Sequence, residues 1–404
     1  MPICIRDLIE GALNCVENVA EVKKGQDVLI LADTTCDNDV IEAYAIASGI
    51  VGGNVSTLIL DSDIAGASPN EINERGYFVA LPKMAWHAMI ASDVTLNISN
   101  FIEVHSLFGT GQSAYQLDSF MDLVTKHKTR LVRVQIATKE QLASDYAKFP
   151  EDLLQYIGIK AYEAVSNAAE STGTENAEVR VFDPLGTDLT FYGFGLITGW
   201  RVGGEKTKST PWKDFGSYNV GLQPAYPSSN AEGRIVSNAL HTGPIPPIAI
   251  DVKEGKGVSI EGGGAAGNKW RLDWEKKKNV TSEGRHFSDH SQPGINWLEE
   301  CMYATHPKAF RLDGKYAYEG TLADHSWFTG SRRSGTLHFA FGGGINQEYT
   351  HRDLEIFKPT VRINEQPIIT EGRLEVLDSI DVREEAKKYG DPDELLMEDW
   401  IPDM

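Results

Sequence analysis

Two hydrophobic periods alternate along the first 170 residues. Apolar residues recur at helical spacing from Ile5 to Ala20, whereas Val28–Ala32 is a continuous apolar run typical of a buried strand. The same pattern predicts further helices over 39–49, 84–91 and 152–169, and further strands over 55–60, 94–98 and 131–136. Strands that alternate with helices form a parallel sheet covered on both faces. We therefore expect an α/β domain with a mostly parallel sheet.

The pattern changes after a polar link at residues 170–175. Glycine, aromatic and β-branched residues dominate the remainder, with turn signals every several residues. Short strands are predicted over 179–182, 189–192, 249–252, 257–260 and 360–363. We expect an α/β N-terminal domain of residues 1–172 and a β-rich (α+β) metal-binding catalytic domain of residues 173–404.

Composition and charge narrow the choice of partners. The chain has 58 acidic and 38 basic residues, a net charge of −20, which repels phosphate backbones and anionic lipids. Its four cysteines form no CxxC pair, which favours reduced thiols. The sequence shows neither a signal-type apolar segment nor a run long enough to span a membrane. We expect a cytoplasmic protein with a small-molecule substrate and no nucleic-acid or membrane partner.

Nucleotide cofactors are not favoured by the first predicted strand. The residues that follow it, Ala32-Asp33-Thr34-Thr35-Cys36-Asp37, contain two carboxylates and no glycine. A dinucleotide pyrophosphate needs a glycine-rich turn at this position. The chain also lacks the GxxxxGK[ST] loop that binds nucleotide phosphates.

Metal-binding side chains are concentrated between residues 286 and 353, which hold six of the ten histidines. His351 and Asp353 are two residues apart, so in a strand both point to the same face. His338 lies in an apolar alternating strand, where a half-buried structural histidine is the simpler interpretation. One of Glu299 and Glu300 is expected to point inward, and a buried carboxylate needs a cation or hydrogen-bond donors. Imidazole and carboxylate together suit zinc, iron, manganese or cobalt.

Four segments of this half resemble a known family. They are Asn296-x-x-x-Glu300 with Ala304-Thr-His-Pro307, Gly335-Thr-Leu-His-Phe-Ala-Phe-Gly342, His351-Arg-Asp353 and Ile368-Ile-Thr-Glu-Gly-Arg373. Together they resemble the C-terminal half of the M29 (aminopeptidase T-type) metallopeptidases, a superfamily that also contains the ferrous 2,5-dihydroxypyridine 5,6-dioxygenases. The resemblance implies an α/β domain, a β-rich metal-binding domain and a homo-oligomer.

The resemblance also implies roles for particular residues. Glu300, His338, His351 and Asp353 match metal ligands of the family, with Glu299 as an alternative to Glu300. The segment that begins at Ser92 and ends with His105-Ser106 resembles the dioxygenase segment in which a His-Ser pair reaches the aromatic substrate. His105 and Ser106 are therefore the expected catalytic residues, with His105 as the acid/base group.

Two departures from the family pattern affect the expected reaction. The turn Pro227-Ser228-Ser229-Asn230 lacks the glutamate that the peptidases carry there, which argues against a two-metal hydrolytic site. Glu300 stands where the dioxygenases have a histidine of their facial triad, which makes the ligand set more anionic. The overall resemblance is nearer the dioxygenase-like branch.

These observations predict a metal-dependent, ring-opening dioxygenase-like enzyme for a small hydroxylated aromatic or N-heterocyclic compound. We expect one divalent metal ion, first Fe(II), with Mn, Zn or Co as alternatives. Trp297 and Tyr303 are expected to line the substrate pocket, and Arg332 or Arg333 to recognise a substrate carboxylate. The alternatives are an M29-type metallo-aminopeptidase or amide hydrolase, and a non-catalytic metal-binding homologue.

Overall fold

The chain folds into two compact units. The computed structural model describes residues 2–61, 83–98, 126–136, 138–198, 212–216, 219–224, 230–240, 243–279, 296–310, 332–342 and 352–398. The N-terminal unit comprises residues 1–152, 203–217 and 310–329, and the C-terminal unit comprises residues 153–202, 218–309 and 330–404. The boundary expected near residue 172 falls inside the second of these units.

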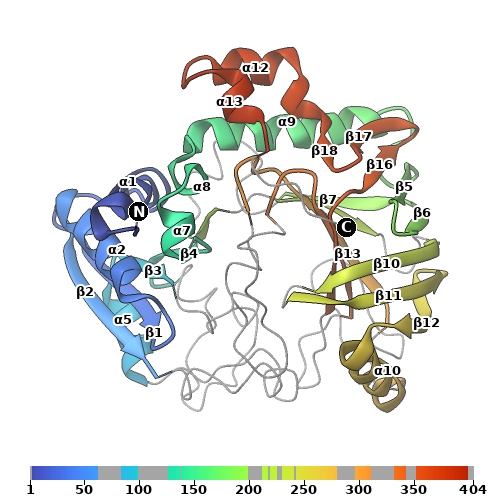
Figure 1. Cartoon of the computed structure of the whole chain (residues 1–404), viewed down its shortest axis with the longest axis horizontal. Helices are drawn as coiled ribbons and strands as arrows, with labels where there is room; N and C mark the ends of the chain where they lie inside the picture. Colours follow the sequence, from blue (N-terminus) through green and yellow to red (C-terminus); the bar gives the residue numbers. More distant parts are fainter. Residues whose placement is uncertain are drawn as a thin grey trace. The chain divides into compact units, whose positions relative to one another are not determined.

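The N-terminal unit is built on the parallel sheet that the sequence predicts (Figure 1). Its strand order is β2-β1-β3-β4-β8, and every neighbouring pair is parallel. The strands are β1 (Asp27–Asp33), β2 (Asn54–Leu60), β3 (Val94–Asn97), β4 (Arg130–Val134) and β8 (Trp212–Phe215). The apolar run at 28–32 forms the buried part of β1 and separates β2 from β3, as a fully covered parallel strand requires.

Helices form where the sequence predicts them in this unit. The first helical segment consists of α1 (Ile5–Leu13) and a π-helical continuation (Asn14–Val19), followed later by α2 (Asn38–Ile50) and α5 (Lys83–Ala91). The side chain of Asp37 caps α2 by accepting a hydrogen bond from the backbone N–H of Asp39. Two short helices, α7 (Lys139–Leu142) and α8 (Asp145–Lys148), complete the described part of the unit.

The described residues of the C-terminal unit form a large, curled antiparallel sheet of 13 strands. Its main path runs β18-β17-β16-β5-β6-β10-β15-β14-β13-β9-β7, and β11 and β12 extend it from β10. The strands are β5 (Glu178–Phe182), β6 (Asp188–Tyr192), β7 (Phe194–Thr198), β9 (Asn219–Pro224), β10 (Glu232–Leu240), β11 (Gly243–Lys253), β12 (Lys256–Gly262), β13 (Leu298–Ala304), β14 (Leu337–Phe341), β15 (Arg352–Ile356), β16 (Thr360–Ile363), β17 (Gln366–Thr370) and β18 (Arg373–Leu374). This sheet confirms the β-rich second half.

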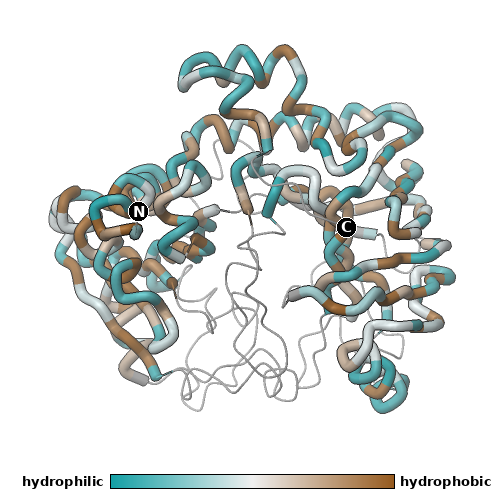
Figure 2. The backbone as a smooth tube through the Cα atoms, viewed as in Figure 1, coloured by the Kyte–Doolittle hydropathy of each residue, from teal (hydrophilic) through white to brown (hydrophobic). Residues whose placement is uncertain are grey.

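Helix α9 (Glu151–Ala169) packs on this sheet through one apolar stripe. The stripe repeats every four residues and is fully buried; it consists of Leu153, Ile157, Ala161 and Val165. Figure 2 shows hydrophilic and hydrophobic residues alternating along the helices. The Tyr303 hydroxyl on β13 donates a hydrogen bond to the Ala161 carbonyl at 3.3 Å, which fixes α9 against β13. Helix α10 (Gly264–Lys277) also belongs to this unit.

The acidic segment that begins at Asp381 is folded in its described part. It forms α12 (Ile380–Ala386) and α13 (Pro392–Leu396), and Val382, Ala386 and Leu396 are buried. Lys160 of α9 pairs with Asp381 at 3.2 Å. The segment is therefore a packed part of the C-terminal unit up to its last described residue, Glu398. Among the described residues, no helix has both the length and the apolarity needed to cross a membrane.

Candidate metal centre

Three adjacent strands of the large sheet carry the candidate ligands. In the antiparallel register Glu300 of β13 lies opposite Ala340 of β14, and Ala340 lies opposite Asp353 of β15. Directly opposite residues share one face of a sheet. His338 lies two residues before Ala340, so it projects from the same face. The strand pairing thus assembles one imidazole and two carboxylates from segments that are 38 and 15 residues apart in sequence.

The three side chains lie close enough to hold one ion. One ligand atom from each of Glu300, His338 and Asp353 lies within 4.8 Å of the other two. His338 Nε2 is 3.5 Å from Glu300 Oε2, and both His338 and Asp353 are buried. Buried carboxylates beside an imidazole form a donor set that divalent transition metals accept. The residues therefore fit a divalent metal, as the sequence predicts.

A β-bulge turns Glu300 toward this face. Leu298 pairs with Phe341 and Glu300 pairs with Ala340, so Glu299 is an extra residue between two successive pairs. An inserted residue reverses the side-chain alternation along the strand. As a result Glu300 joins the cluster while Leu298 stays on the opposite, apolar face. Of the two neighbouring glutamates, Glu300 is the one in the group of potential ligands.

The opposite face of the three strands anchors the cluster in the core. Cys301, Phe339 and Leu354 form one row across the strands, and all three are fully buried. Burial raises the pKa of the Cys301 thiol far above its ordinary value, which keeps the sulfur protonated on the face away from the cluster. On the cluster face, the small side chain of Ala340 lies between Glu300 and Asp353 and leaves space between the two carboxylates.

Some of the predicted site residues fall outside the described part of the chain. These are His351, His105 and Ser106. His351 precedes the first described residue of β15, so its expected alignment with Asp353 stays a prediction. The roles expected of His105 and Ser106 also stay predictions.

Two other predicted site residues, Tyr303 and Arg333, form hydrogen bonds to backbone carbonyls of other segments. Tyr303 is three residues from Glu300 along β13, and its ring is buried on the face that meets α9. Arg333 is buried, and its Nη1 donates hydrogen bonds to the carbonyls of Ser334 and Gly372. Burial lowers the pKa of the Arg333 guanidinium, and Glu398 opposes this effect. Tyr303 and Arg333 thus stabilise packing in the structure, and the substrate-binding roles expected of them stay predictions.

Arg332 is buried as well, beside the turn that leads into β14. That turn ends at Gly335, whose φ of +76° is an unfavourable backbone conformation for residues with a Cβ atom. An added Cβ would lie 2.1 Å from the Gly372 carbonyl oxygen. The turn is therefore tightly held at the start of the strand that carries His338. A role for Arg332 in substrate recognition stays a prediction.

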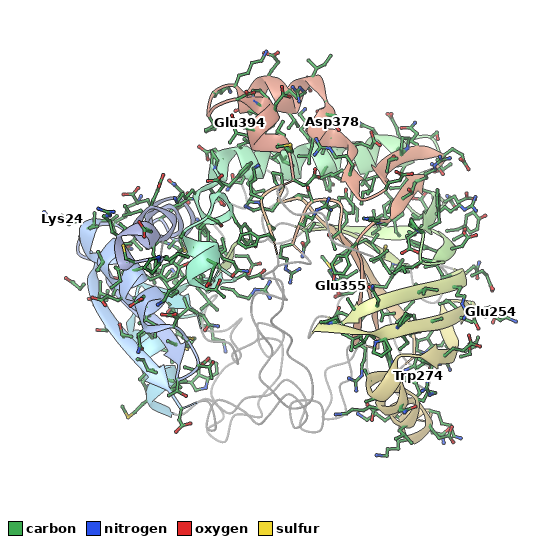
Figure 3. All side chains as sticks on the ribbon, in the orientation of Figure 1. Lys24, Glu254, Trp274, Glu355, Asp378 and Glu394 are labelled. Carbon is green, nitrogen blue, oxygen red and sulfur yellow. The ribbon has the colours of Figure 1, made fainter. Side chains whose placement is uncertain are left out.

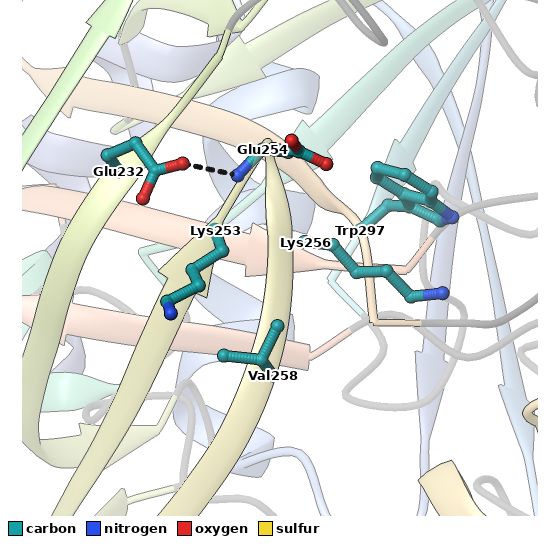
Figure 4. Close-up of a pocket in the computed structure, with 6 residues that line it drawn as sticks. All are labelled: Glu232, Lys253, Glu254, Lys256, Val258 and Trp297. Carbon is teal, nitrogen blue, oxygen red and sulfur yellow. Dashed lines mark hydrogen bonds between the residues drawn. The ribbon is translucent and has the colours of Figure 1, made fainter.

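Trp297 lines a separate cavity of about 420 Å³ (Figure 4). Lys256 Nζ lies 5.1 Å from the centroid of its indole ring, a cation–π distance. The other lining residues are Glu232, Lys253, Glu254 and Val258. In Figure 3, Glu254 lies at the outer edge of the C-terminal unit, well apart from Glu355 on the strand of Asp353. The cavity that contains Trp297 includes none of the three candidate metal ligands.

The fold and the cluster together define a two-unit chain with a parallel-sheet unit and an antiparallel-sheet unit that bears a candidate metal site. Two solved structures share this architecture. The structure of 2,5-dihydroxypyridine dioxygenase from Pseudomonas putida KT2440 has a TM-score of 0.54 and 13% identity, over 92% of this chain and 98% of that chain. Wild-type AmpT from Thermus thermophilus has a TM-score of 0.51 and 13% identity, over 91% of this chain and 99% of that one.

The likeness extends over nearly the whole length of both neighbours, and it establishes a common fold. The fold that the sequence resemblance implies, an α/β domain together with a β-rich domain, is thus confirmed. No protein-family model and no curated protein matches the sequence.

Proposed function

We propose that the chain is a metal-dependent enzyme that acts on a small hydroxylated aromatic or N-heterocyclic compound, with dioxygenase-like ring opening as its reaction. The observation that carries the proposal is the group of Glu300, His338 and Asp353 within 4.8 Å on one sheet face. The fold shared with a 2,5-dihydroxypyridine dioxygenase supports the reaction class. Fe(II) is the proposed ion, with manganese, zinc and cobalt as alternatives.

A divalent ion at this cluster would act as a Lewis acid that favours the anionic form of a ring hydroxyl. The protein side of the site would hold that ion with Glu300 and Asp353 as anionic donors and His338 as the nitrogen donor. The contact between His338 Nε2 and Glu300 Oε2 orients the imidazole toward the donor group. Burial of His338 and Asp353 limits access of water to these atoms.

His351 and the pair His105-Ser106 complete the proposal from the sequence. His351 would add a second imidazole on the face of Asp353. His105 would take a proton from the ring hydroxyl at one of its ring nitrogens, and Ser106 would hydrogen-bond the substrate. With His351 included, the donors would comprise two imidazoles and two carboxylates, one carboxylate more than the facial triad of ferrous oxygenases.

Oxygen uptake by the Fe(II)-loaded protein tests the reaction class. The purified chain, loaded anaerobically, would be mixed with oxygen and a panel of hydroxylated pyridines and phenols. We expect substrate-dependent oxygen consumption and loss of the aromatic absorbance, both abolished in His338→Ala. The matched control is His87→Ala, on α5 of the N-terminal unit and outside the cluster. Oxygen consumption that persists in His338→Ala would contradict the assignment of the site.

A hydrolase is the second candidate, and the donor set favours it. The described donors are two carboxylates and one imidazole, a harder set than two imidazoles and one carboxylate. The second structural neighbour, AmpT, is an M29 aminopeptidase, and its TM-score is close to that of the dioxygenase. Oxygen-independent release of amino acids from peptides by the manganese-, cobalt- or zinc-loaded chain would select this function. Metal binding without turnover in both screens would select a non-catalytic homologue.

A further inference from the structure

A fourth chemically competent side chain lies on the same face of the three strands. Glu355 is two residues beyond Asp353 on β15, so the alternation of the strand directs both carboxylates to one face. The register places Glu355 directly opposite His338 of β14. Glu355 is therefore the immediate neighbour of two grouped ligands, one along the strand and one across it.

Glu355 is a buried carboxylate beside a second buried carboxylate, Asp353. Glu355 is only 2% exposed and Asp353 only 8% exposed. The effective penalty for burying an ionised carboxylate is several kcal/mol unless an opposite charge or hydrogen bonds offset it. A divalent ion at the cluster would offset the charge of all three carboxylates.

The geometry allows Glu355 to reach such an ion. Directly opposite residues in antiparallel strands have Cβ atoms about 4.5–5.5 Å apart. A glutamate has three side-chain torsions, so rotation moves its carboxylate by a comparable distance. The close group in the structure comprises Glu300, His338 and Asp353, with Glu355 beside it. Ion binding would therefore draw the Glu355 carboxylate inward from a neighbouring position.

We propose that Glu355 is an additional protein ligand of the divalent ion bound by Glu300, His338 and Asp353. This inference rests on the metal site of the proposed function. It makes the described donor set three carboxylates and one imidazole, which favours hard ions such as Mn²⁺ over softer ones. It also leaves one position fewer for water on the bound ion.

Mn²⁺ binding to the full chain tests the proposal without any assay of activity. Electron paramagnetic resonance gives the affinity from the free Mn²⁺ signal, and water-proton relaxation gives the number of exchangeable waters on the bound ion. We expect Glu355→Gln to weaken binding at least about tenfold, because loss of even an outer-sphere partner of a metal site costs about 10–100-fold. We expect Glu355→Ala to add about one exchangeable water. Glu355→Gln retains the volume and keeps the test valid if the alanine variant does not fold.

Glu254→Gln is the matched control, since this exposed glutamate lines the cavity at the edge of the unit. It should bind Mn²⁺ with wild-type affinity and hydration. Unchanged hydration in Glu355→Ala and unchanged affinity in Glu355→Gln would overturn the inference while leaving the three-residue site intact. Weakened binding with unchanged hydration would also overturn it, because Glu355 would then only orient a ligand. If the wild-type chain itself bound no Mn²⁺, the proposed function would fail rather than the role of Glu355.

Discussion

The carboxylate cluster should have two effects on stability: its charges repel each other without metal, and they bind a stabilising metal ion. Asp353→Asn should separate these two effects. The carboxylates of Glu300 and Asp353 have oxygen atoms within 4.8 Å of each other. Two unit charges at that distance repel by roughly 3.5 kcal/mol at an effective dielectric constant of about 20. The substitution removes one charge and nearly preserves the shape of the side chain. The metal-free variant should therefore be more stable than the metal-free wild type, by up to about 3.5 kcal/mol.

Bound metal should make the wild type more stable than Asp353→Asn, which reverses the order expected without metal. A ligand at 100 times its dissociation constant stabilises the native state by about 2.7 kcal/mol. The wild-type chain should gain this stability from Mn²⁺, whereas Asp353→Asn should gain much less because it lacks one anionic ligand. Thermal unfolding would be followed by circular dichroism in chelator and in excess Mn²⁺. One kcal/mol corresponds to a shift in the unfolding midpoint of roughly 2–4 °C for a unit of 150–250 residues.

Asp188→Asn is the control for this experiment. Asp188 is an exposed aspartate of β6 that pairs with Arg180 at 3.4 Å, and β10 separates β6 from β15 in the sheet. Its replacement should change stability by less than about 0.5 kcal/mol with or without metal. The reasoning would be refuted if metal-free Asp353→Asn were less stable than wild type and still gained the full stabilisation from Mn²⁺.

Three further substitutions test the cluster, its support by α9 and an ion pair beside β18 at the end of the sheet. Ala340→Leu fills the space between the carboxylates of Glu300 and Asp353, so the Mn²⁺ affinity measured by titration calorimetry should fall at least about tenfold. The larger side chain should also lower the free energy of unfolding by about 1–3 kcal/mol through overpacking. Tyr303→Phe removes the hydrogen bond to Ala161, so urea unfolding should show a loss of about 1 kcal/mol with unchanged Mn²⁺ affinity. The hydrogen bond from Arg373 lowers the pKa of Asp378 below its ordinary value of 3.8. The ionised carboxylate of Asp378 therefore stabilises the fold above pH 3.8. This stabilisation is lost as the pH falls through the lowered pKa. Asp378→Asn should therefore show a smaller loss of stability than wild type in that acid range.

Local sequence patterns were sufficient for several of the regular elements of the fold. The run at 28–32 is apolar at every position, and such a run predicts a strand that is covered on both faces. The stripe on α9 has a spacing of four residues, which predicts a helix with one buried face. Strand β8, in contrast, joins the parallel sheet of the N-terminal unit although it lies among segments of the β-rich half. No local periodicity states which sheet a short strand will join.

The candidate metal site was predictable in residue type but not in assembly. The strand register places Ala340 opposite both Glu300 and Asp353. This register cannot be read from the number of residues between His338 and Asp353 in the sequence. The position of Tyr303 was within reach of the sequence, because residues three apart in a regular strand point to opposite faces. Glu355 also had a sequence signal, since it repeats the spacing of two that connects His351 with Asp353.

The bulge at Glu299 explains why the choice between adjacent glutamates needed the structure. Without the extra residue, Glu300 would share the apolar face of Leu298, because the two residues are two positions apart. The paired residues on β14 show that the alternation reverses between them. Bulges of this kind redirect single side chains and often lie beside functional sites.

The most direct test of the account is the metal content of the freshly purified chain, handled anaerobically and measured by elemental analysis. We expect about one divalent ion per chain, with iron as the proposed metal. The ion should be lost from a folded His338→Ala, Asp353→Ala double variant. A wild-type chain that neither contains nor takes up a divalent ion, or a double variant that keeps its full complement, would contradict the central claim that Glu300, His338 and Asp353 form a metal site.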